Sequence, residues 1–126
     1  MKIVADRNIP FFEGVFEPYA EVIYKEGQDI SVEDVREADA LVIRTRTRCD
    51  ASLLDGSSVK LIATATIGTD HIDMEYCTSR GIEVHNAQGC NAGGVMQYVF
   101  SALYGVSARK AIKLEDAVFG VIGVGN

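Results

Sequence analysis

Short apolar stretches alternate with helix-forming segments along the whole chain, and this alternation limits the fold more than any other feature. The apolar stretches predict strands over residues 2–5, 21–24, 40–43, 59–65, 82–85 and 118–122. Amphipathic spacing and cap residues predict helices over residues 11–19, 32–37, 51–54, 73–80 and 91–110. Strands and helices in this order form βαβ units, which indicates a parallel sheet.

The strand expected over residues 40–43 is apolar without interruption, Ala-Leu-Val-Ile. Strands of this kind are buried on both faces, whereas a half-solvated antiparallel strand alternates polar and apolar residues. We therefore predict an α/β fold with a doubly wound parallel sheet. Residues 1–90 are expected to form a flavodoxin-like domain, and residues 91–126 are expected to hold a helix and the first strand of a Rossmann domain.

The charge balance argues against nucleic acid as a partner. The chain has 12 Lys and Arg residues against 18 Asp and Glu residues, a net charge of −6, which repels a phosphate backbone. No apolar run approaches the roughly 20 residues that span a bilayer, and the first residues do not form a signal peptide. These features predict a soluble cytoplasmic protein with no membrane partner.

The cysteines Cys49, Cys77 and Cys90 form no CxxC pair and are expected to be reduced thiols, with Cys90 a small buried residue.

The longest expected helix, residues 91–110, carries two adjacent apolar stripes. One stripe is formed by Val95, Val99 and Leu103, and the other by Met96, Phe100 and Tyr104. A helix with such a broad apolar front is buried. It is either a core helix of one domain or a helix wedged between domains or subunits, and the sequence leaves both alternatives open.

The last residues, Val-Phe-Gly-Val-Ile-Gly-Val-Gly-Asn, predict a buried strand that runs into a glycine-rich turn. In the G-x-G-x-x-G fingerprint, the first glycine allows a tight turn and the second lets the backbone approach a pyrophosphate. Gly123 and Gly125 occupy those two positions, and with Asn126 they are candidate nucleotide-binding residues. The pair alone is weak evidence, because the third glycine and the acidic ribose partner are not among these 126 residues.

The segment Thr-Ala-Thr-Ile-Gly-Thr-Asp-His-Ile-Asp, residues 64–73, follows a buried strand and precedes an expected helix. Backbone N–H groups and threonine hydroxyls can therefore converge on an anion at a helix N-terminus. Thr66 and Gly68 are the candidate binding residues. The alternative is that these residues are ordinary turn and cap residues, and it has about equal weight.

A second candidate segment is Arg44-Thr45-Arg46-Thr47-Arg48, at the end of the strand expected over residues 40–43. In an extended backbone the three arginines share one side and the two threonines the other, so either side can bind a phosphate or a carboxylate. Solvated surface arginines are the equally weighted alternative.

The two histidines, His71 and His85, suggest a metal site or acid–base chemistry. Neither lies near a second histidine or a tight carboxylate cluster at ligand spacing, so no metal site is expected. Asp70 and Asp73, on either side of His71, are explained as a helix cap and a first-turn charge.

The segments VIRTRT, LIATATIGTDHIDM, NAQGCNAGGVMQYVFSAL and VIGVGN resemble the D-isomer-specific 2-hydroxyacid dehydrogenases over essentially the whole chain. The resemblance implies an NAD-dependent oxidation of 4-phospho-D-erythronate at its 2-hydroxyl, in vitamin B6 biosynthesis. It also implies a homodimer, a substrate-binding domain in residues 1–90, and an interdomain helix with the start of a truncated NAD-binding domain in residues 91–126.

By the same resemblance, Thr45, Thr66, Arg44 and Gly68 bind the substrate, and the NAD site includes the terminal glycine turn. The position of Thr45 is often serine in the family, and Arg46 departs from the family pattern, so Arg46 and Arg48 receive no role. The catalytic Arg, Glu and His of the family are expected downstream, so no catalytic residue is assigned to this chain, which we expect to be inactive alone.

Two other functions compete with this one. Another 2-hydroxyacid dehydrogenase, such as 3-phosphoglycerate dehydrogenase, would share the glycine turn and the long helix. A non-enzymatic receiver-like binding module has the same strand pattern, but it needs paired acids after its first strand and an Asp after its third. Here Asp6 stands alone, and Arg44 follows the third strand.

Overall fold

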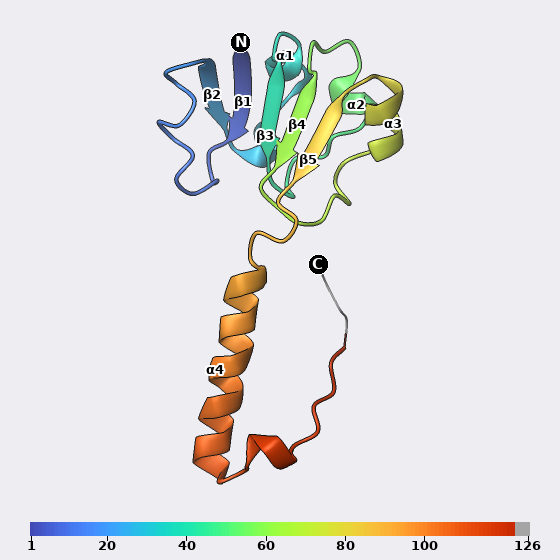
Figure 1. The fold of residues 1–126 in the computed structure, drawn as a ribbon. Helices are drawn as coiled ribbons and strands as arrows, with labels where there is room; N and C mark the ends of the chain where they lie inside the picture. Colours follow the sequence, from blue (N-terminus) through green and yellow to red (C-terminus); the bar gives the residue numbers. More distant parts are fainter. Residues whose placement is uncertain (123–126) are drawn as a thin grey trace. The chain divides into compact units, whose positions relative to one another are not determined.

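The structure, a computed structural model, describes residues 1–122. The chain divides into two compact units, Met1–Gln88 and Gly89–Asn126, which Figure 1 shows in blue to yellow and in orange to red. Among the described residues, no helix is both long and apolar enough to cross a bilayer.

The first unit is built on a five-stranded parallel sheet with the order β2-β1-β3-β4-β5. Its strands are β1 (Lys2–Asp6), β2 (Glu21–Lys25), β3 (Ala40–Ile43), β4 (Leu61–Thr64) and β5 (Glu83–Asn86). This confirms the predicted α/β class and the parallel sheet. The strand order reverses between β1 and β3, which is the flavodoxin-like arrangement and places ligands at the carboxyl ends of these strands.

Three short helices belong to this unit: α1 (Val32–Val35), α2 (Ala51–Leu54) and α3 (Met74–Ser79). The carboxylate of Asp50 caps α2 by accepting from the N–H of Ser52 at 2.9 Å, as its position predicts. Helix α3 ends before Gly81, whose φ of 68° lies in the left-handed region that favours glycine.

One apolar cluster joins the sheet to the helices. Val4, Leu41 and Ile62 form a row across β1, β3 and β4 and are completely buried. Their partners from the helices are Val35, Leu54 and Cys77. β1 and β3 are buried along most of their length, as expected, whereas residues of the edge strands β2 and β5 are half-buried or exposed.

Residues 7–20 contain turns and no helix, so the helix predicted over residues 11–19 is wrong. Phe11 has a φ of 60° and Gly14 a φ of 87°, and neither conformation continues a right-handed helix. Pro18 also removes a backbone N–H that a helix would use. The apolar spacing suggested a helix, but the backbone conformations of Phe11 and Gly14 do not allow one.

The second unit contains α4 (Ala92–Lys110) and a short 3₁₀ helix, η2 (Leu114–Asp116). The long helix was predicted within one residue of its observed start. The strand predicted over residues 118–122 does not form, because a strand needs a hydrogen-bonding neighbour and the described part of this unit contains no other strand. The candidate nucleotide-binding residues Gly123, Gly125 and Asn126 lie outside the described residues.

Candidate functional site

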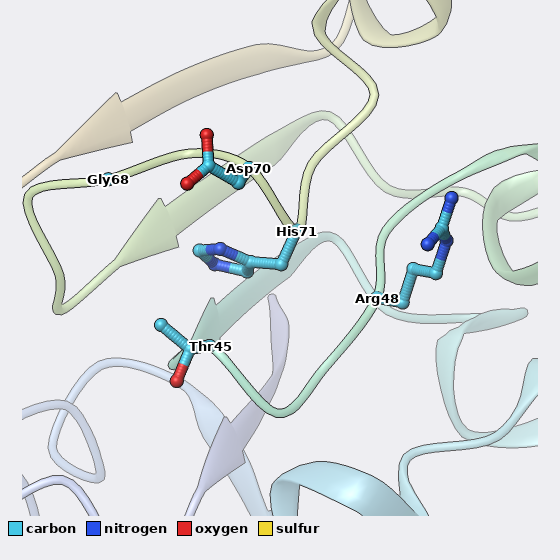
Figure 2. A pocket seen from close by; sticks show the side chains of 5 residues that line it. All are labelled: Thr45, Arg48, Gly68, Asp70 and His71. Carbon is cyan, nitrogen blue, oxygen red and sulfur yellow. The ribbon is translucent and has the colours of Figure 1, made fainter.

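A cavity of about 420 Å³ lies in the loops that follow β3 and β4, and Figure 2 shows its lining side chains. Thr45 and Arg48 come from the loop after β3, and Gly68, Asp70 and His71 come from the loop after β4. This is the edge of a parallel sheet at which open α/β folds bind ligands. Thr45 and Gly68, two of the predicted substrate-binding residues, therefore line one cavity.

The segment after β3 turns instead of extending the strand. The N–H of Thr47 donates to the carbonyl of Arg44 at 3.3 Å, which closes the turn. The Thr47 hydroxyl then donates to the carbonyl of Gly27 at 2.8 Å and is buried, whereas Thr45 is exposed. The expected common face for Thr45 and Thr47 is therefore wrong, because that expectation assumed an extended backbone.

These two threonines should respond differently to valine, which has nearly the same shape and no hydroxyl. We expect Thr47→Val to lower the free energy of unfolding by roughly 1–3 kcal/mol, because it leaves the buried Gly27 carbonyl without its donor. Thr45→Val is the matched control and should unfold like the wild type. Urea denaturation checks this, and equal midpoints for the two variants would contradict it.

Arg44 and Arg46 bind neighbouring loops. Nη1 of Arg44 donates to the carbonyl of Asn8 at 3.2 Å, and Nη1 of Arg46 donates to Oε1 of Gln28 at 3.2 Å. Arg44 therefore joins the loops after β1 and β3, where the strand order reverses. It is not among the residues that line the cavity.

Arg48 lines the cavity although the sequence assigned it no role. Its Nε donates to Oδ2 of Asp50 at 2.7 Å, and Figure 2 shows the guanidinium directed away from Thr45 and from the ring of His71. Hydrogen bonds from Ser52 and from Arg48 lower the pKa of Asp50 to about 2, so the carboxylate is charged at neutral pH. A ligand anion in the cavity would have to compete with Asp50 for this guanidinium.

Three side chains and one carbonyl in the β4 segment form a continuous set of polar contacts. Oγ1 of Thr64 lies 2.6 Å from Oγ1 of Thr66 and 3.1 Å from Nε2 of His71. Oγ1 of Thr66 donates to the carbonyl of Gly68 at 3.1 Å. Burial lowers the pKa of His71, and the nearby charge of Asp70 opposes that shift in pKa.

The backbone of the loop after β4 is held by its carbonyl groups. Those of residues 66–69 accept hydrogen bonds from Ala87 N, Asn86 Nδ2, Thr66 Oγ1 and Ile72 N, respectively. Within residues 1–122, the N–H groups of residues 66–71 donate to no protein group. These amides are available to a ligand, but the carboxylate of Asp70 lines the same cavity, and an anion bound there has to avoid it.

The N-terminus of α3 is not part of this arrangement. The helix begins at Met74, and Asp73 caps it by accepting from the N–H of Tyr76 at 2.9 Å. The helix therefore follows residues 64–73 as predicted, and anion binding at its N-terminus stays a prediction that the Asp73 carboxylate disfavours. The available donors belong to the preceding loop.

The remaining candidates lie elsewhere. His85 is exposed on β5, with Nε2 3.5 Å from Oε2 of Glu83. Within residues 1–122, no group of His, Cys, Asp or Glu is arranged to hold a metal ion. All three cysteines are free, with Cys49 and Cys77 buried and Cys90 exposed. The expectation that Cys90 is buried is wrong, because this residue lies in the turn before α4.

Comparison with known proteins finds one family. Residues 2–117 match the catalytic domain of the D-isomer specific 2-hydroxyacid dehydrogenases. The chain is 53% identical over its full length to erythronate-4-phosphate dehydrogenase of Bacteroides fragilis, and covers 36% of that protein. It is 43% identical over its full length to the protein of the same name from Porphyromonas gingivalis, and covers 34% of it. The chain thus spans about a third of the length of these relatives.

Solved structures share the fold. The NAD⁺-bound 3-phosphoglycerate dehydrogenase of Entamoeba histolytica matches with a TM-score of 0.61 at 30% identity, over 80% of this chain and 37% of that one. The D-lactate dehydrogenase of Aquifex aeolicus, complexed with NAD and lactic acid, matches with a TM-score of 0.64 at 18% identity, over 93% of this chain and 39% of that one.

Proposed function

Since this chain belongs to the D-isomer specific 2-hydroxyacid dehydrogenase family, we propose that the complete protein oxidises 4-phospho-D-erythronate to its 2-oxo acid with NAD⁺. The observation that carries this proposal is the 53% identity, over the whole chain, to an erythronate-4-phosphate dehydrogenase. Because the chain belongs to this family of dehydrogenases, we no longer interpret it as a non-enzymatic receiver-like binding module. The reaction belongs to pyridoxal 5′-phosphate biosynthesis, as the resemblance implies.

The first unit supplies substrate contacts in this proposal. Thr45, Thr66 and Gly68 bind the anionic substrate in this proposal. It is supported by Thr45 and Gly68 in the cavity lining, by the bond from Thr66 to the Gly68 carbonyl, and by the N–H groups of residues 66–71, which have no acceptor among the described residues. Arg44 contributes a charged donor from the loop after β3, since its side chain is exposed and its one hydrogen bond among the described residues is to the carbonyl of Asn8. A substrate with one carboxylate and one phosphate needs several such donors.

The NAD site includes Gly123, Gly125 and Asn126 in this proposal. NAD⁺ bound there would supply the hydride acceptor for oxidation at C2 of the substrate. The proton of the 2-hydroxyl goes to a histidine base, supported by a glutamate, while an arginine orients the carboxylate. We propose that these three catalytic residues belong to the rest of the complete protein and that residues 1–122 bind and orient the substrate.

A substrate comparison tests this function. The complete protein should reduce NAD⁺ with 4-phospho-D-erythronate at a kcat/KM at least about a hundredfold above that for 3-phosphoglycerate. 4-Phospho-D-erythronate has one more hydroxyl, and a site that hydrogen-bonds this hydroxyl is left with an unpaired polar group when 3-phosphoglycerate binds. Absorbance of NADH at saturating NAD⁺ measures both rates. The 30% identity to a 3-phosphoglycerate dehydrogenase supports that enzyme as the second candidate, and a preference for 3-phosphoglycerate would select it.

We also propose a homodimer in which α4 contributes to a subunit or domain boundary. Val95, Met96, Val99, Phe100 and Tyr104 are all exposed on this helix. An apolar surface of this extent is rarely left in contact with water.

The free cysteines support a reducing compartment, so we propose that the enzyme lies in the cytoplasm.

Charge on α4 should weaken the proposed self-association. We expect Phe100→Asp to shift the complete protein from dimer to monomer in sedimentation velocity, because an aspartate cannot be buried unpaired in an apolar contact. Ser101→Asp adds the same charge at the neighbouring exposed position and is the control. A wild type that sediments as a monodisperse monomer would contradict the proposed dimer.

A further inference from the structure

His71, Thr64 and Thr66 form a chain of hydrogen bonds that ends at the carbonyl of Gly68. Which atom donates in each of these bonds follows from that carbonyl. The Gly68 carbonyl only accepts, so the single proton of the Thr66 hydroxyl is the one donated across 3.1 Å. The 2.6 Å contact between Thr66 and Thr64 then requires the Thr64 hydroxyl to donate. With the Thr64 proton used there, the 3.1 Å contact to His71 requires Nε2 of the imidazole to donate to Thr64.

From this order of donors we infer that His71 is a positioning residue, which holds its proton on Nε2 and thereby directs the Thr66 hydroxyl proton toward the substrate. The inference rests on the proposed function, in which Thr66 contacts the substrate. His71 also lines the cavity, and in this proposal it acts through Thr64 and not on the reacting atoms. Its role is to orient a donor before the substrate arrives.

The surroundings keep this chain in place. Thr64 is only 3% exposed, so water does not readily supply an alternative partner for its hydroxyl. The backbone at His71 is fixed because its carbonyl accepts from the N–H of Cys49 at 2.8 Å, and the N–H of Asp73 donates to the Cys49 carbonyl at 2.8 Å. The ring of His71 is therefore held beside the buried hydroxyl at the end of β4.

The bond from Thr66 to Gly68 is the one that a substrate can replace. Gly68 lines the cavity; Thr66 does not itself line it, but it is half-buried and its hydroxyl donates to the Gly68 carbonyl, so a ligand bound at Gly68 lies next to that hydroxyl. A carboxylate or phosphate oxygen is a stronger acceptor than a carbonyl, and the Thr66 proton can turn to it without reversing any other bond. Each donor in such a chain also strengthens the next. The arrangement therefore favours a ligand that accepts a hydrogen bond over one that donates.

The tautomer of His71 gives a test that needs no substrate. In the complete protein labelled with ¹⁵N-histidine, the signals of His71 are those that vanish in the His71→Gln variant. At pH 8 we expect a long-range ¹H–¹⁵N spectrum to show the proton on Nε2 and none on Nδ1. A proton on Nδ1 alone would reverse the chain and overturn the inference.

Kinetics with 4-phospho-D-erythronate test whether the hydrogen bonds from His71 and Thr64 affect the function of Thr66. We expect His71→Leu, which has no donor, to raise KM about fivefold or more, and His71→Gln, which keeps an N–H group, to restore most of the loss. Thr64→Val should raise KM as His71→Leu does, and Thr64→Ser should restore it. The double variant His71→Leu/Thr64→Val should lose no more than Thr64→Val alone, because both changes break one chain.

Additive losses in the double variant, or a His71→Gln variant as impaired as His71→Leu, would overturn the inference. Thermal melting identifies any variant that fails to fold, and for such a variant the tautomer measured in the wild type decides the question. If the wild type does not oxidise 4-phospho-D-erythronate, the proposed function fails while the tautomer result stands. The two failures are therefore distinguishable.

Discussion

Replacement of Ile62 by alanine is expected to lower the free energy of unfolding by roughly 2–5 kcal/mol, which is a large part of the stability of a domain of this size. Ile62 is completely buried in β4, beside Leu41 in the neighbouring strand, and belongs to the cluster that joins the sheet to the helices. Alanine leaves a cavity that the rigid central strands cannot close.

Urea denaturation of the complete protein, followed by circular dichroism, measures this loss. Ile67→Ala is the matched control, because it removes the same atoms from a side chain that is 49% exposed. It should change the free energy of unfolding by less than about 1 kcal/mol. Equal losses for the two variants would mean that Ile62 is not part of a packed core.

Thr66→Ala is expected to lower kcat/KM for 4-phospho-D-erythronate by about tenfold or more, which corresponds to the loss of one hydrogen bond to a charged group. The Thr66 hydroxyl is the last donor of the chain from His71, and its present acceptor is the Gly68 carbonyl beside the cavity. Alanine removes this donor and leaves the loop backbone bonds in place.

Steady-state kinetics of the complete enzyme check this effect. Thr66→Ser keeps the hydroxyl and should restore most of the activity. Wild-type kinetics for Thr66→Ala would remove Thr66 from the site.

Local patterns predicted the sheet of this protein well. The strands over β1 to β4 were recognisable because their apolar residues are contiguous, and Asp50 was recognisable as a cap because a carboxylate before a helix has a specific local partner. Such features depend on neighbours within a few residues. The terminal segment 118–122 has the same apolar composition but forms no strand, since pairing depends on another segment.

The candidate site was also predicted only in part. Sequence placed Thr45, Thr66 and Gly68 in loops at the ends of strands, and the family resemblance supplied their proposed role. It did not separate Thr45 from Thr47, because the burial of Thr47 depends on the carbonyl of Gly27, twenty residues away. Nor did it predict a role for His71, whose contact with Thr64 exists only because the intervening loop folds back on itself.

The amino-acid sequence by itself determined the α/β class, the parallel strands and the family, since these depend on local apolar patterns and on residue identity. Only the tertiary structure decided which polar groups in the loops are free to bind a ligand. Each donor and acceptor can be used by any group that comes within hydrogen-bond distance, so a side chain's availability depends on what the fold brings beside it. That is why Arg48 is found paired with Asp50, Thr47 is buried, and the N–H groups of residues 66–71 donate to no group in the described part of the chain.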